Sequence, residues 1–411
     1  MRAARFLLVF VLLPRLVVAQ GNPLGPEFRV NTYGPNDQAE PSVAADSSGN
    51  FVVIWQREYG AFDTHISGQR YATSGVPLGA EFRVNASTFG TCAAPSVAGD
   101  PAGNFVVIWQ FAPLEPGGVL GQRYASSGVP LGGNFLVGNS AYNFNPAVAS
   151  DSSGNFVVVW EDLFPNPTAG NVFGQRFANS GPPLGSVFRV NTYTTGHQAV
   201  ASVAVDPSGN FVVVWNSGAQ DGSGYGVYGQ RFARSGAPVG TEFRVNTYTP
   251  NDQSSPSAAA DSSGNFVVVW QSALQDGSGH GVFGQRYAGS GAPLGPEFRV
   301  NTFTTSDQRR PSVAADGAGN FVVLWQSLSQ DGAGLGVFGQ RYASSGIPLG
   351  PEFLVNTYTS LAQAAPSVAS DSFGNFVVAW QSLNQDGSGY GVFGQRYQPI
   401  LPVELMRFGV E

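Results

Sequence analysis

The sequence predicts an all-β fold, a seven-bladed β-propeller with four antiparallel strands in each blade. Three observations support this prediction. All the tryptophans recur at intervals of 51 to 55 residues, each repeat contains the same four strand-length segments, and one copy of the fourth segment precedes all the others. We number the repeats 1 to 7 by their tryptophans, which are Trp55, Trp109, Trp160, Trp215, Trp270, Trp325 and Trp380.

The four segments have the residue types expected of strands that run from the centre of a propeller to its rim. In residues 256–302 they read PSAAAD, GNFVVVW, GVFGQRY and PLGPEFRVNT. The first is made of small side chains, which suit the crowded inner edge where the sheets converge. The second is apolar at successive positions, so both of its faces must be buried. The last alternates apolar and polar residues, as a half-exposed outer strand does.

The offset of the fourth segment predicts how the ring closes. Glu27 to Asn31 form its first copy, whereas the last repeat, from Pro366 to Tyr397, stops after its third segment. We therefore expect the N-terminal strand to complete the last blade by hydrogen bonding to it. An open solenoid would instead need distinct caps at its two ends.

Both ends of the chain differ in composition from the repeats. Residues 1–19 contain two early arginines and an apolar run from Phe6 to Leu13, which is typical of a secretory signal peptide, so we expect a secreted protein, extracellular or at the cell surface. Residues 20–397 are predicted to form the propeller. Residues 398–411 form a tail, QPILPVELMRFGVE, which is either a sorting or attachment signal or a strand packed on the outside of the propeller.

Composition excludes several classes of function. All 20 basic residues are arginine, so Schiff-base and lysine-base chemistry is excluded. The formal net charge of −7 argues against nucleic acid and anionic membranes as partners, and no segment after residue 19 is apolar enough for membrane insertion. A single cysteine, Cys92, rules out an intramolecular disulfide framework. We expect a monomer.

Two further patterns occur in every repeat and are predicted to be structural. The turn between the first two segments reads Asp, two residues, Gly, Asn, as in Asp46 to Asn50, where the glycine supplies a positive φ and the aspartate bonds the turn backbone. A calcium site there stays an alternative, but each turn offers one carboxylate and calcium needs several oxygens. We therefore expect no metal or cofactor. The arginine of each Gln-Arg pair is predicted to brace neighbouring sheets.

The hairpin SVAADSSGNFVVVW resembles the inner hairpin of NHL-type propellers. The longer unit, with GNFVVVWQS, QDGSGYGVFGQRY and EFRVNTYT, resembles a repeat of exported bacterial proteins whose function is mostly unassigned. The resemblance covers residues 22–397 and implies a bacterial source and a propeller fold. It carries no catalytic motif. The tryptophan that ends the second strand departs from NHL repeats, so their ligand preferences are not transferred.

One face of the predicted propeller gathers the irregular loops. Because successive strands alternate in direction, the loops after second strands and the loops between blades emerge together. Asp, Tyr and Gln side chains in such loops suit hydrogen bonding to polyols and stacking on sugars, or contact with a protein loop. The predicted ligand-binding residues are Asp37, Asp221, Tyr225, Asp252, Asp276, His280, Asp307, Asp331, Asp386 and Tyr390.

Catalysis would require a break in the repeat that places an acid or base beside a nucleophile. The candidates are Glu58, Asp63 and His65 in repeat 1 and Glu161 with Asp162 in repeat 3. Paired carboxylates facing each other across the channel mouth could hydrolyse glycosides. The three histidines, His65, His197 and His280, lie in different blades, which argues against a histidine metal cluster.

The function predicted from these observations is a non-enzymatic binding or interaction module that recognises a glycan or a protein through its irregular loop face. The alternative is a carbohydrate-active hydrolase or lyase that uses carboxylates on the same face. The sequence does not contain a motif that decides between them.

Overall fold

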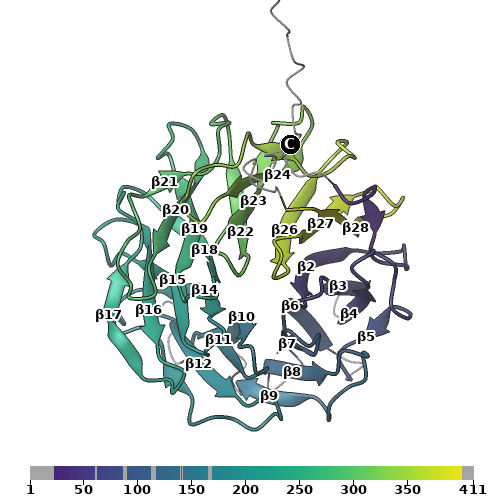
Figure 1. Ribbon diagram of the computed structural model, residues 1–411, viewed down its shortest axis with the longest axis horizontal. Coiled ribbons are helices and arrows are strands. Elements are labelled where there is room, and N and C mark those ends of the chain that lie inside the picture. Colours follow the sequence, from purple (N-terminus) through teal and green to yellow (C-terminus); the bar gives the residue numbers. More distant parts are fainter. Residues whose placement is uncertain are drawn as a thin grey trace, which may run out of the picture.

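A computed structural model describes residues 23–60, 63–86, 90–112, 117–138, 140, 142–164 and 169–399. Every regular element in these ranges is a β-strand, and the sheets are arranged around a central opening (Figure 1). Within the same ranges there is no helix long and apolar enough to cross a membrane. The predicted signal peptide and nearly all of the predicted tail lie outside the described residues.

Each repeat contributes four strands in the predicted order. The innermost strands are β2 (Gln38–Ala45), β6 (Gly90–Gly99), β10 (Asn143–Ser150), β14 (Gln198–Val205), β18 (Gln253–Ala260), β22 (Gln308–Ala315) and β26 (Gln363–Ser370). The second strands, which carry the tryptophans, are β3 (Phe51–Gly60), β7 (Phe105–Ala112), β11 (Phe156–Asp162), β15 (Phe211–Gly218), β19 (Phe266–Ala273), β23 (Phe321–Leu328) and β27 (Phe376–Leu383).

The two outer positions are filled by longer third strands and mostly short fourth strands. The third strands are β4 (Asp63–Tyr71), β8 (Gly118–Tyr124), β12 (Asn171–Phe177), β16 (Tyr225–Phe232), β20 (His280–Tyr287), β24 (Leu335–Tyr342) and β28 (Tyr390–Tyr397). The fourth strands are β1 (Phe28–Arg29), β5 (Phe82–Arg83), β9 (Phe135–Gly138), β13 (Phe188–Arg189), β17 (Pro238–Arg244), β21 (Phe298–Arg299) and β25 (Phe353–Leu354).

The sheets confirm four antiparallel strands per repeat, with one difference in repeats 1 and 2. Repeats 3 to 7 each form a separate four-stranded sheet, but repeats 1 and 2 share an eight-stranded sheet. The two are joined by a short parallel pairing in which Asp63 lies opposite Gly90 and Thr64 opposite Thr91. This join exists because the hairpin of β3 and β4 is longer than its counterparts in the other repeats.

The N-terminal strand pairs with the last repeat, as the sequence predicts. β1 lies antiparallel to β28, with Phe28 opposite Gly394 and Arg29 opposite Phe393, in a sheet of order β1-β28-β27-β26. The N–H of Val30 donates to the carbonyl of Val392 at 2.8 Å. In Figure 1 the purple beginning of the chain accordingly lies beside yellow β28.

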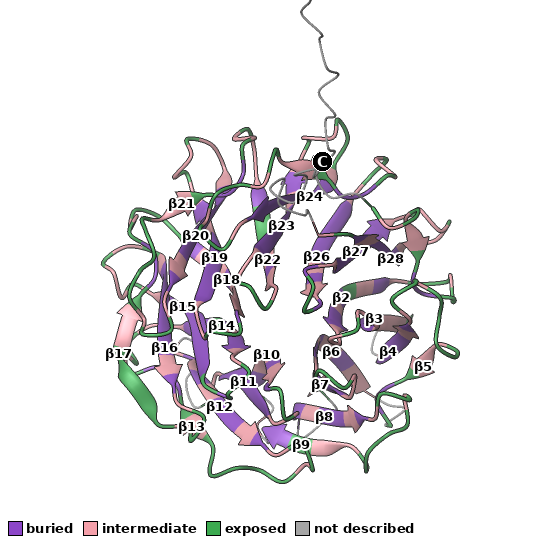
Figure 2. Cartoon of the chain, in the orientation of Figure 1, coloured by how far each residue is buried: buried purple, intermediate pink, exposed green. Residues whose placement is uncertain are grey.

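The core lies between neighbouring sheets rather than in one central mass. Val212 and Val214 of repeat 4 pack against Phe266, Val268 and Trp270 of repeat 5, and equivalent clusters recur around the ring. The second strands are therefore buried on both faces, as their unbroken apolar sequence predicts, and Figure 2 shows them in purple. Each fully buried side chain of this kind contributes about 1.5–3 kcal/mol to the free energy of folding.

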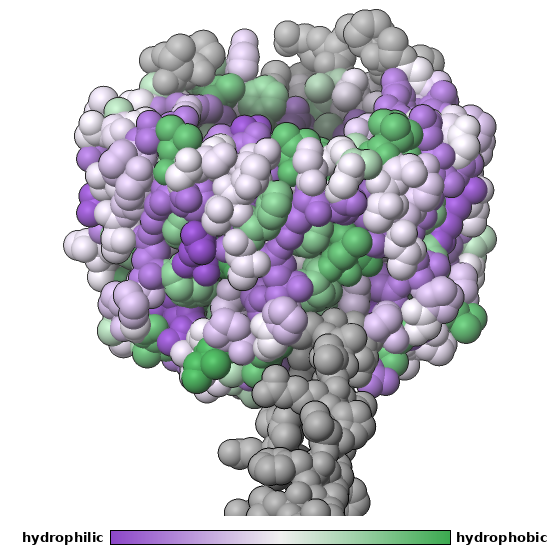
Figure 3. Space-filling view, turned by 90° about the horizontal axis from the view of Figure 1, so that it is seen from above, coloured by the Kyte–Doolittle hydropathy of each residue, from purple (hydrophilic) through white to green (hydrophobic). Residues whose placement is uncertain are grey.

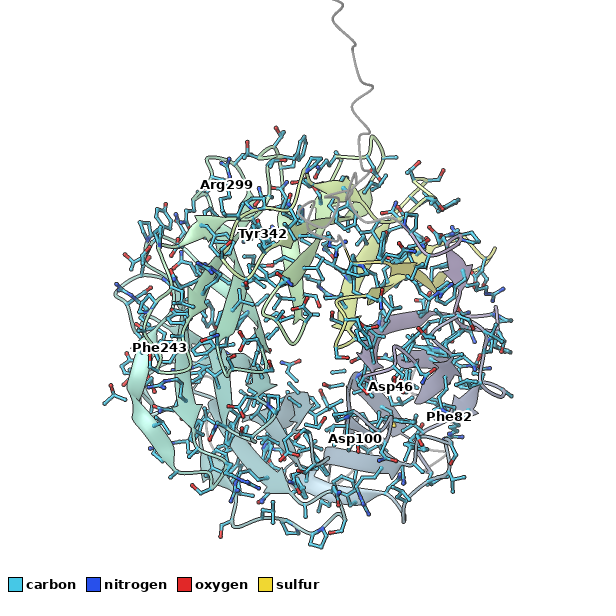
Figure 4. The ribbon with its side chains drawn as sticks, in the orientation of Figure 1. Asp46, Phe82, Asp100, Phe243, Arg299 and Tyr342 are labelled. Atoms are coloured by element: carbon cyan, nitrogen blue, oxygen red, sulfur yellow. The ribbon has the colours of Figure 1, made fainter. Side chains whose placement is uncertain are left out.

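The outer wall is mixed in character. In the side view of Figure 3, small apolar areas are scattered among polar ones over the edge of the ring. Figure 4 places Phe82 and Phe243 at this outer edge, and Asp46 and Asp100 near the central opening. The rings of Phe82 and Tyr124 lie 5.4 Å apart, so the fourth strand packs an aromatic ring inward against the next repeat while its polar neighbour faces solvent.

The residues common to all repeats act structurally. In the turn of repeat 3, Oδ1 of Asp151 accepts the N–H groups of Ser153 and Asn155 at 2.8 and 2.9 Å. In the same repeat the guanidinium of Arg176 donates to the backbone carbonyl of Arg234 in repeat 4 at 2.5 Å. The turn is thus closed by its own aspartate, and the arginine braces the next sheet as predicted.

Candidate functional site

We call the face formed by the loops after second strands and the loops between repeats the upper face, and the opposite face the lower face. The two kinds of upper loop contact each other directly. The N–H of Glu58, in the loop hairpin of repeat 1, donates to the carbonyl of Asp37 in the loop before that repeat at 2.9 Å. The irregular loops therefore share a face, as the alternation of strand direction predicts.

Four of the predicted ligand-binding aspartates, Asp221, Asp276, Asp331 and Asp386, lie in the regular upper turns of repeats 4 to 7. Oδ2 of Asp276 accepts the side-chain amide of Asn301 at 3.1 Å. Oδ2 of Asp386 accepts that of Asn31 at 3.3 Å and pairs with Arg29 at 2.9 Å. Asp276 and Asp386 thus tie their turns to the end of the fourth strand of the same sheet, whereas the buried Oδ2 of Asp331 has no hydrogen-bond partner among the described residues.

Three more predicted residues, Asp37, Asp252 and Asp307, act on a different element. Oδ1 of each accepts the N–H of the first residue of a third strand in the preceding repeat. The distances are 2.8 Å to Tyr390, 2.8 Å to Tyr225 and 3.0 Å to His280. The structure thus brings the predicted residues together in pairs along the rim, each pair joining two repeats.

Asp307 has a further set of charged neighbours. The ring of His280 and the guanidinium of Arg309 each lie 3.0 Å from its Oδ1. Burial raises the pKa of Asp307. The hydrogen bond from His280 and the charge of Arg309 together lower this pKa by more than burial raises it, so the net shift is downward. This carboxyl group therefore remains ionised over a wide range of pH.

The candidate residues of repeat 1 lie in the long hairpin of β3 and β4. Nε2 of His65 lies 2.8 Å from Oδ1 of Asp63, and the imidazole is nearly fully buried. Burial lowers the pKa of His65, and the charge of Arg83 lowers it further. Glu58 lies opposite Thr64 in this hairpin, and its side chain is half-buried.

A glutamine directly after the tryptophan connects repeats on the upper face near the central opening. Oε1 of Gln271, Gln326 and Gln381 accepts the N–H of a residue in the next repeat, namely Arg310, Ala365 and Glu40, at 3.0, 3.1 and 2.9 Å. We call these glutamines the inter-repeat amides. In repeat 3 the same position is occupied by Glu161.

Glu161 makes a different set of contacts. It is 3% exposed, and its Oε1 lies 2.5 Å from Nε2 of His197 at the start of repeat 4. Its Oε2 accepts the side-chain amide of Asn145 at 3.1 Å. The other ring nitrogen of His197, Nδ1, lies 3.3 Å from the hydroxyl of Tyr225. Glu161, His197 and Tyr225 therefore form a continuous chain of hydrogen bonds.

The carboxylate controls the imidazole electrostatically. The hydrogen bond from His197 to Glu161 raises the pKa of His197, an effect that burial offsets only in part. Because an ionised carboxylate only accepts hydrogen bonds, Nε2 carries the proton in the neutral imidazole and Nδ1 accepts the hydroxyl proton of Tyr225. The arrangement can move a proton between Tyr225 and His197.

Sequence reasoning identified Glu161 and Tyr225 as candidates, but it considered His197 only as a metal ligand. Two departures from the repeat pattern in the sequence could have indicated that Glu161 and His197 form a pair. A glutamate replaces the inter-repeat amide, and a histidine stands before Gln198 where the loops of repeats 1, 5 and 6 have an aspartate. The neighbouring candidate, Asp162, is not part of the chain of hydrogen bonds, because its Oδ1 accepts the N–H of Phe164 at 2.9 Å.

Two exposed aromatic rings lie at the upper end of the same repeat. Tyr142 and Phe164 are 49% and 64% exposed, and their ring centroids are 6.2 Å apart. The N–H of Leu163 donates to the carbonyl of Tyr142 at 3.0 Å. A Cβ on Gly170 would lie within 2.8 Å of both Leu163 and His197, so the loop packs closely against the imidazole. The aromatic rings and the proton-transfer residues thus belong to one packed region.

Several cavities lie elsewhere among the described residues, on the lower face. One of about 510 Å³ lies between repeats 2 and 3 and is lined by Asp100, Asn104, Arg123 and their neighbours. Similar cavities recur between other pairs of repeats and are lined by the equivalent turn aspartates and arginines. Because these residues occur in every repeat and brace the sheets, we attribute the cavities to sheet packing. Among the described residues no cluster of three or more His, Cys, Asp or Glu side chains is placed to hold a metal ion.

Comparison with known proteins identifies the fold class but not a family. No family model matches the chain, and no curated protein is similar to it in sequence. A protein of unknown function from Dyadobacter fermentans is similar in structure, with a TM-score of 0.54 and 12% identity over 92% of this chain and 99% of that one. The polysaccharide lyase Uly1 has a TM-score of 0.53 and 9% identity over 92% and 94% of the two chains. The phage phi92 endosialidase has a TM-score of 0.53 and 9% identity over 96% and 73%.

These comparisons correct the functional prediction made from the sequence. The chain has the all-β, propeller-like fold of these proteins, built from repeated four-stranded antiparallel sheets. Four of the solved structures that it resembles are named as an endosialidase, an arabinofuranosidase, a sialidase and a polysaccharide lyase, and another is named as an alcohol oxidase. By this comparison, the prediction of a non-enzymatic binding module is wrong.

Proposed function

We propose that this protein is a carbohydrate-active enzyme, a lyase or hydrolase that cleaves glycosidic bonds on its upper face. The observation that carries the proposal is the hydrogen-bonded chain of Glu161, His197 and Tyr225. It stands at the one position around the ring where a glutamate replaces the amide of the repeat. Similar structures named as a polysaccharide lyase and an endosialidase support the choice of a glycan as substrate.

In this proposal each residue has a distinct role. Glu161 holds the imidazole in one tautomer and favours its protonated form. His197 takes the hydroxyl proton of Tyr225, and the oxygen of Tyr225 exchanges a proton with the substrate. The exposed rings of Tyr142 and Phe164 offer flat surfaces on which sugar rings can stack beside the reacting bond.

Elimination is the route that this geometry supports best. The oxygen of Tyr225, after passing its proton to His197, removes the proton on the carbon next to the carboxylate of a uronate sugar. The electron pair of that C–H bond forms a carbon–carbon double bond, and the bond from the neighbouring carbon to the leaving oxygen breaks with its electron pair on that oxygen. Tyr225 then gives the oxygen a proton, which the His197 imidazolium replaces through its Nδ1 contact with the Tyr225 hydroxyl. This needs one base and one acid, which His197 and Tyr225 supply.

Hydrolysis is the second route, and the charge of the protein favours it. A net charge of −7 repels a polyanionic glycan and suits a weakly charged one. In this route Tyr225, relayed by His197, removes a proton from the water that attacks the anomeric carbon. The bond from that carbon to the leaving oxygen breaks, and the leaving oxygen takes up a proton from the same two residues. Hydrolysis by two facing carboxylates is less well supported, because Glu161 and Asp162 are strand neighbours that point to opposite sides of β11.

The proposal is tested by incubating the purified protein with neutral and uronate-containing polysaccharides and measuring new reducing ends. Ultraviolet absorbance of an unsaturated product identifies elimination, and its absence in a reaction that releases reducing ends identifies hydrolysis. Glu161→Gln and Tyr225→Phe are expected to reduce turnover about 10²- to 10⁴-fold. Gln326→Glu, which places a glutamate at the same position of repeat 6, is the matched control and should retain full activity. Product release by Glu161→Gln at the wild-type rate would overturn the assignment.

The finer architecture and setting are also part of the proposal. We propose a seven-bladed ring, because the tryptophan repeat occurs seven times in the sequence and β1 joins the last sheet. We further propose a monomeric, exported bacterial protein, which the resemblance of the repeat and the first 19 residues support. Mass measurement of the secreted protein in culture medium tests both export and the site of signal cleavage.

A further inference from the structure

Repeat 1 carries a second departure from the repeat pattern on the upper face. The guanidinium of Arg57 contacts the rings of both Tyr33 and Tyr59, and its carbon lies 3.7 and 4.4 Å from their centroids. The two rings are 6.4 Å apart and inclined by 21°. Arg57 is also held by Glu81 at 3.2 Å. One cation therefore contacts both rings and helps to hold them in place.

This arrangement is not required by the fold. Tyr33 has aromatic counterparts in other repeats, but the position of Arg57 is a serine in repeats 4 to 7, as at Ser217, which is fully buried. Tyr59 belongs to the extension of β3 that only repeat 1 has among the described strands. Residues that the sheet itself needs recur in every repeat, so these residues have another role.

The rings are accessible and have polar groups next to them. Tyr33 and Tyr59 are 37% and 44% exposed. The ring of His65 lies 4.4 Å from that of Tyr59 and supports it from the protein side. The carboxylate of Asp63, which accepts from His65, is 45% exposed and can accept sugar hydroxyls at the edge of the rings. The buried Nδ1 of His65 has no hydrogen-bond partner among the described residues.

We propose that Tyr33, Arg57 and Tyr59 form a second, non-catalytic sugar-binding site that holds a neutral pyranose unit of a longer glycan. The inference rests on the proposed function, since it assumes that a glycan lies on the upper face. A pyranose presents a C–H face to an aromatic ring and hydroxyl groups around its edge, which matches exposed tyrosines beside Asp63. With the site of Glu161, it would let the protein hold one chain at two places.

The test uses Glu161→Gln, which removes turnover in the proposed mechanism, so that binding is measured without cleavage. Titration calorimetry with a neutral oligosaccharide and with the polysaccharide substrate should give a Kd at least about tenfold higher when Tyr59→Ala is added, because one sugar–aromatic stack is lost. Tyr59→Phe keeps the ring and should bind as well as the parent. Phe373→Ala, which removes an exposed ring on the lower face, should also leave the Kd unchanged.

The outcomes separate this inference from the proposed function. Cleavage by the wild-type protein together with an unchanged Kd for Tyr59→Ala would overturn the second site and leave the proposed function standing. A raised Kd for Tyr59→Ala in a protein that cleaves no glycan would support the second site and overturn the proposed function. Circular dichroism and thermal unfolding of each variant show whether a raised Kd comes from loss of fold, and Tyr33→Ala provides an independent second removal of the stack.

Discussion

His197 and His65 both contact a carboxylate on the upper face, yet their pKa values move in opposite directions. The hydrogen bond to Glu161 raises the pKa of His197. Burial, followed by the charge of Arg83, lowers the pKa of His65 in spite of Asp63. His197 retains 28% side-chain exposure and His65 only 6%. A nearby carboxylate alone therefore does not set the pKa of a histidine, because burial and other charges around the imidazole also decide whether it is protonated.

The opposite pKa shifts of His197 and His65 suit the two regions to different roles. Glu161 is the one charged group that contributes to the pKa shift of His197. Its negative charge therefore stabilises a proton that His197 takes from Tyr225. Around His65 two arginines, Arg83 and Arg57, oppose protonation. A neutral imidazole there is suited to packing beneath Tyr59, and the charge of the region is carried by Arg57 instead.

The largest expected effect on stability comes from breaking the repeat 1 region. Arg57→Ala removes the cation that contacts both tyrosine rings and leaves Oε1 of Glu81 without its ion-pair partner, although Oε2 still accepts from Thr32. The free energy of unfolding should therefore fall by about 2 kcal/mol. Chemical denaturation measures it. Arg57→Lys keeps the charge but not the flat guanidinium and should fall between wild type and Arg57→Ala. A loss below about 0.5 kcal/mol would show that the stacked arrangement contributes little.

A smaller effect of opposite sign is expected beside His197. Val200 has a φ of 49°, in the left-handed region that a β-branched residue rarely adopts. Val200→Gly should therefore raise the free energy of unfolding by about 1 kcal/mol. Ser255→Gly, at the equivalent position of repeat 5 with a φ of 54°, should gain less, because serine is not β-branched. Destabilisation by Val200→Gly would argue that packing outweighs backbone strain at this position.

The pH dependence of stability should distinguish the two histidines directly. Because the folded state raises the pKa of His197, its contribution is fully present below pH about 6.5 and is lost as pH rises through the folded pKa. His65 has the opposite sign, so it weakens the fold as pH falls below about 6.5. Denaturation of His197→Gln and His65→Gln between pH 5 and 8 checks this.

Relative to wild type, His197→Gln should therefore lose most stability at the acidic end, and His65→Gln should lose least there. The carboxylates titrate in all three proteins, so their effect cancels in the differences. Parallel pH profiles for the two variants would contradict the contrast between the sites.

The smallest effect is expected for an ion pair without a histidine. Arg310 and Glu40 lie on inner strands of repeats 6 and 1 and are 2.8 Å apart, with side chains about half exposed. Glu40→Gln should lower the free energy of unfolding by no more than about 0.5 kcal/mol, and added salt should remove the difference. Arg310→Gln should behave alike, and a loss that persists in high salt would point to a role other than charge pairing.

The sequence was sufficient to predict the repeated four-stranded antiparallel sheets, because each sheet repeats the same four sequence segments. The tryptophans, the unbroken apolar second strands and the early copy of the fourth strand each predict a feature that the sheets contain. The joining of repeats 1 and 2 into one sheet was missed, because it depends on two residue pairs, Asp63 with Gly90 and Thr64 with Thr91, that no pattern relates.

The site was predicted only in part, for a physical reason. Glu161 stands out as a change within a strand, but its partner His197 is 36 residues away and belongs to the next repeat. Which loops meet across a repeat boundary follows from packing and not from spacing. The aspartates of the upper loops were predicted to bind a ligand because of their residue type. In the structure Asp37 and Asp252 instead accept N–H groups of third strands, and a sequence does not reveal such contacts.

The pairing of β1 with β28 has a consequence for how the chain comes to be folded during synthesis. The N–H of Val392 donates to the side chain of Asn31, which left the ribosome 361 residues earlier. Until that contact forms, the last sheet lacks its fourth strand, and the N–H and C=O groups along the outer edge of β28 have no strand partner. The last sheet can therefore be completed only after residues near both ends of the described chain are available to fold.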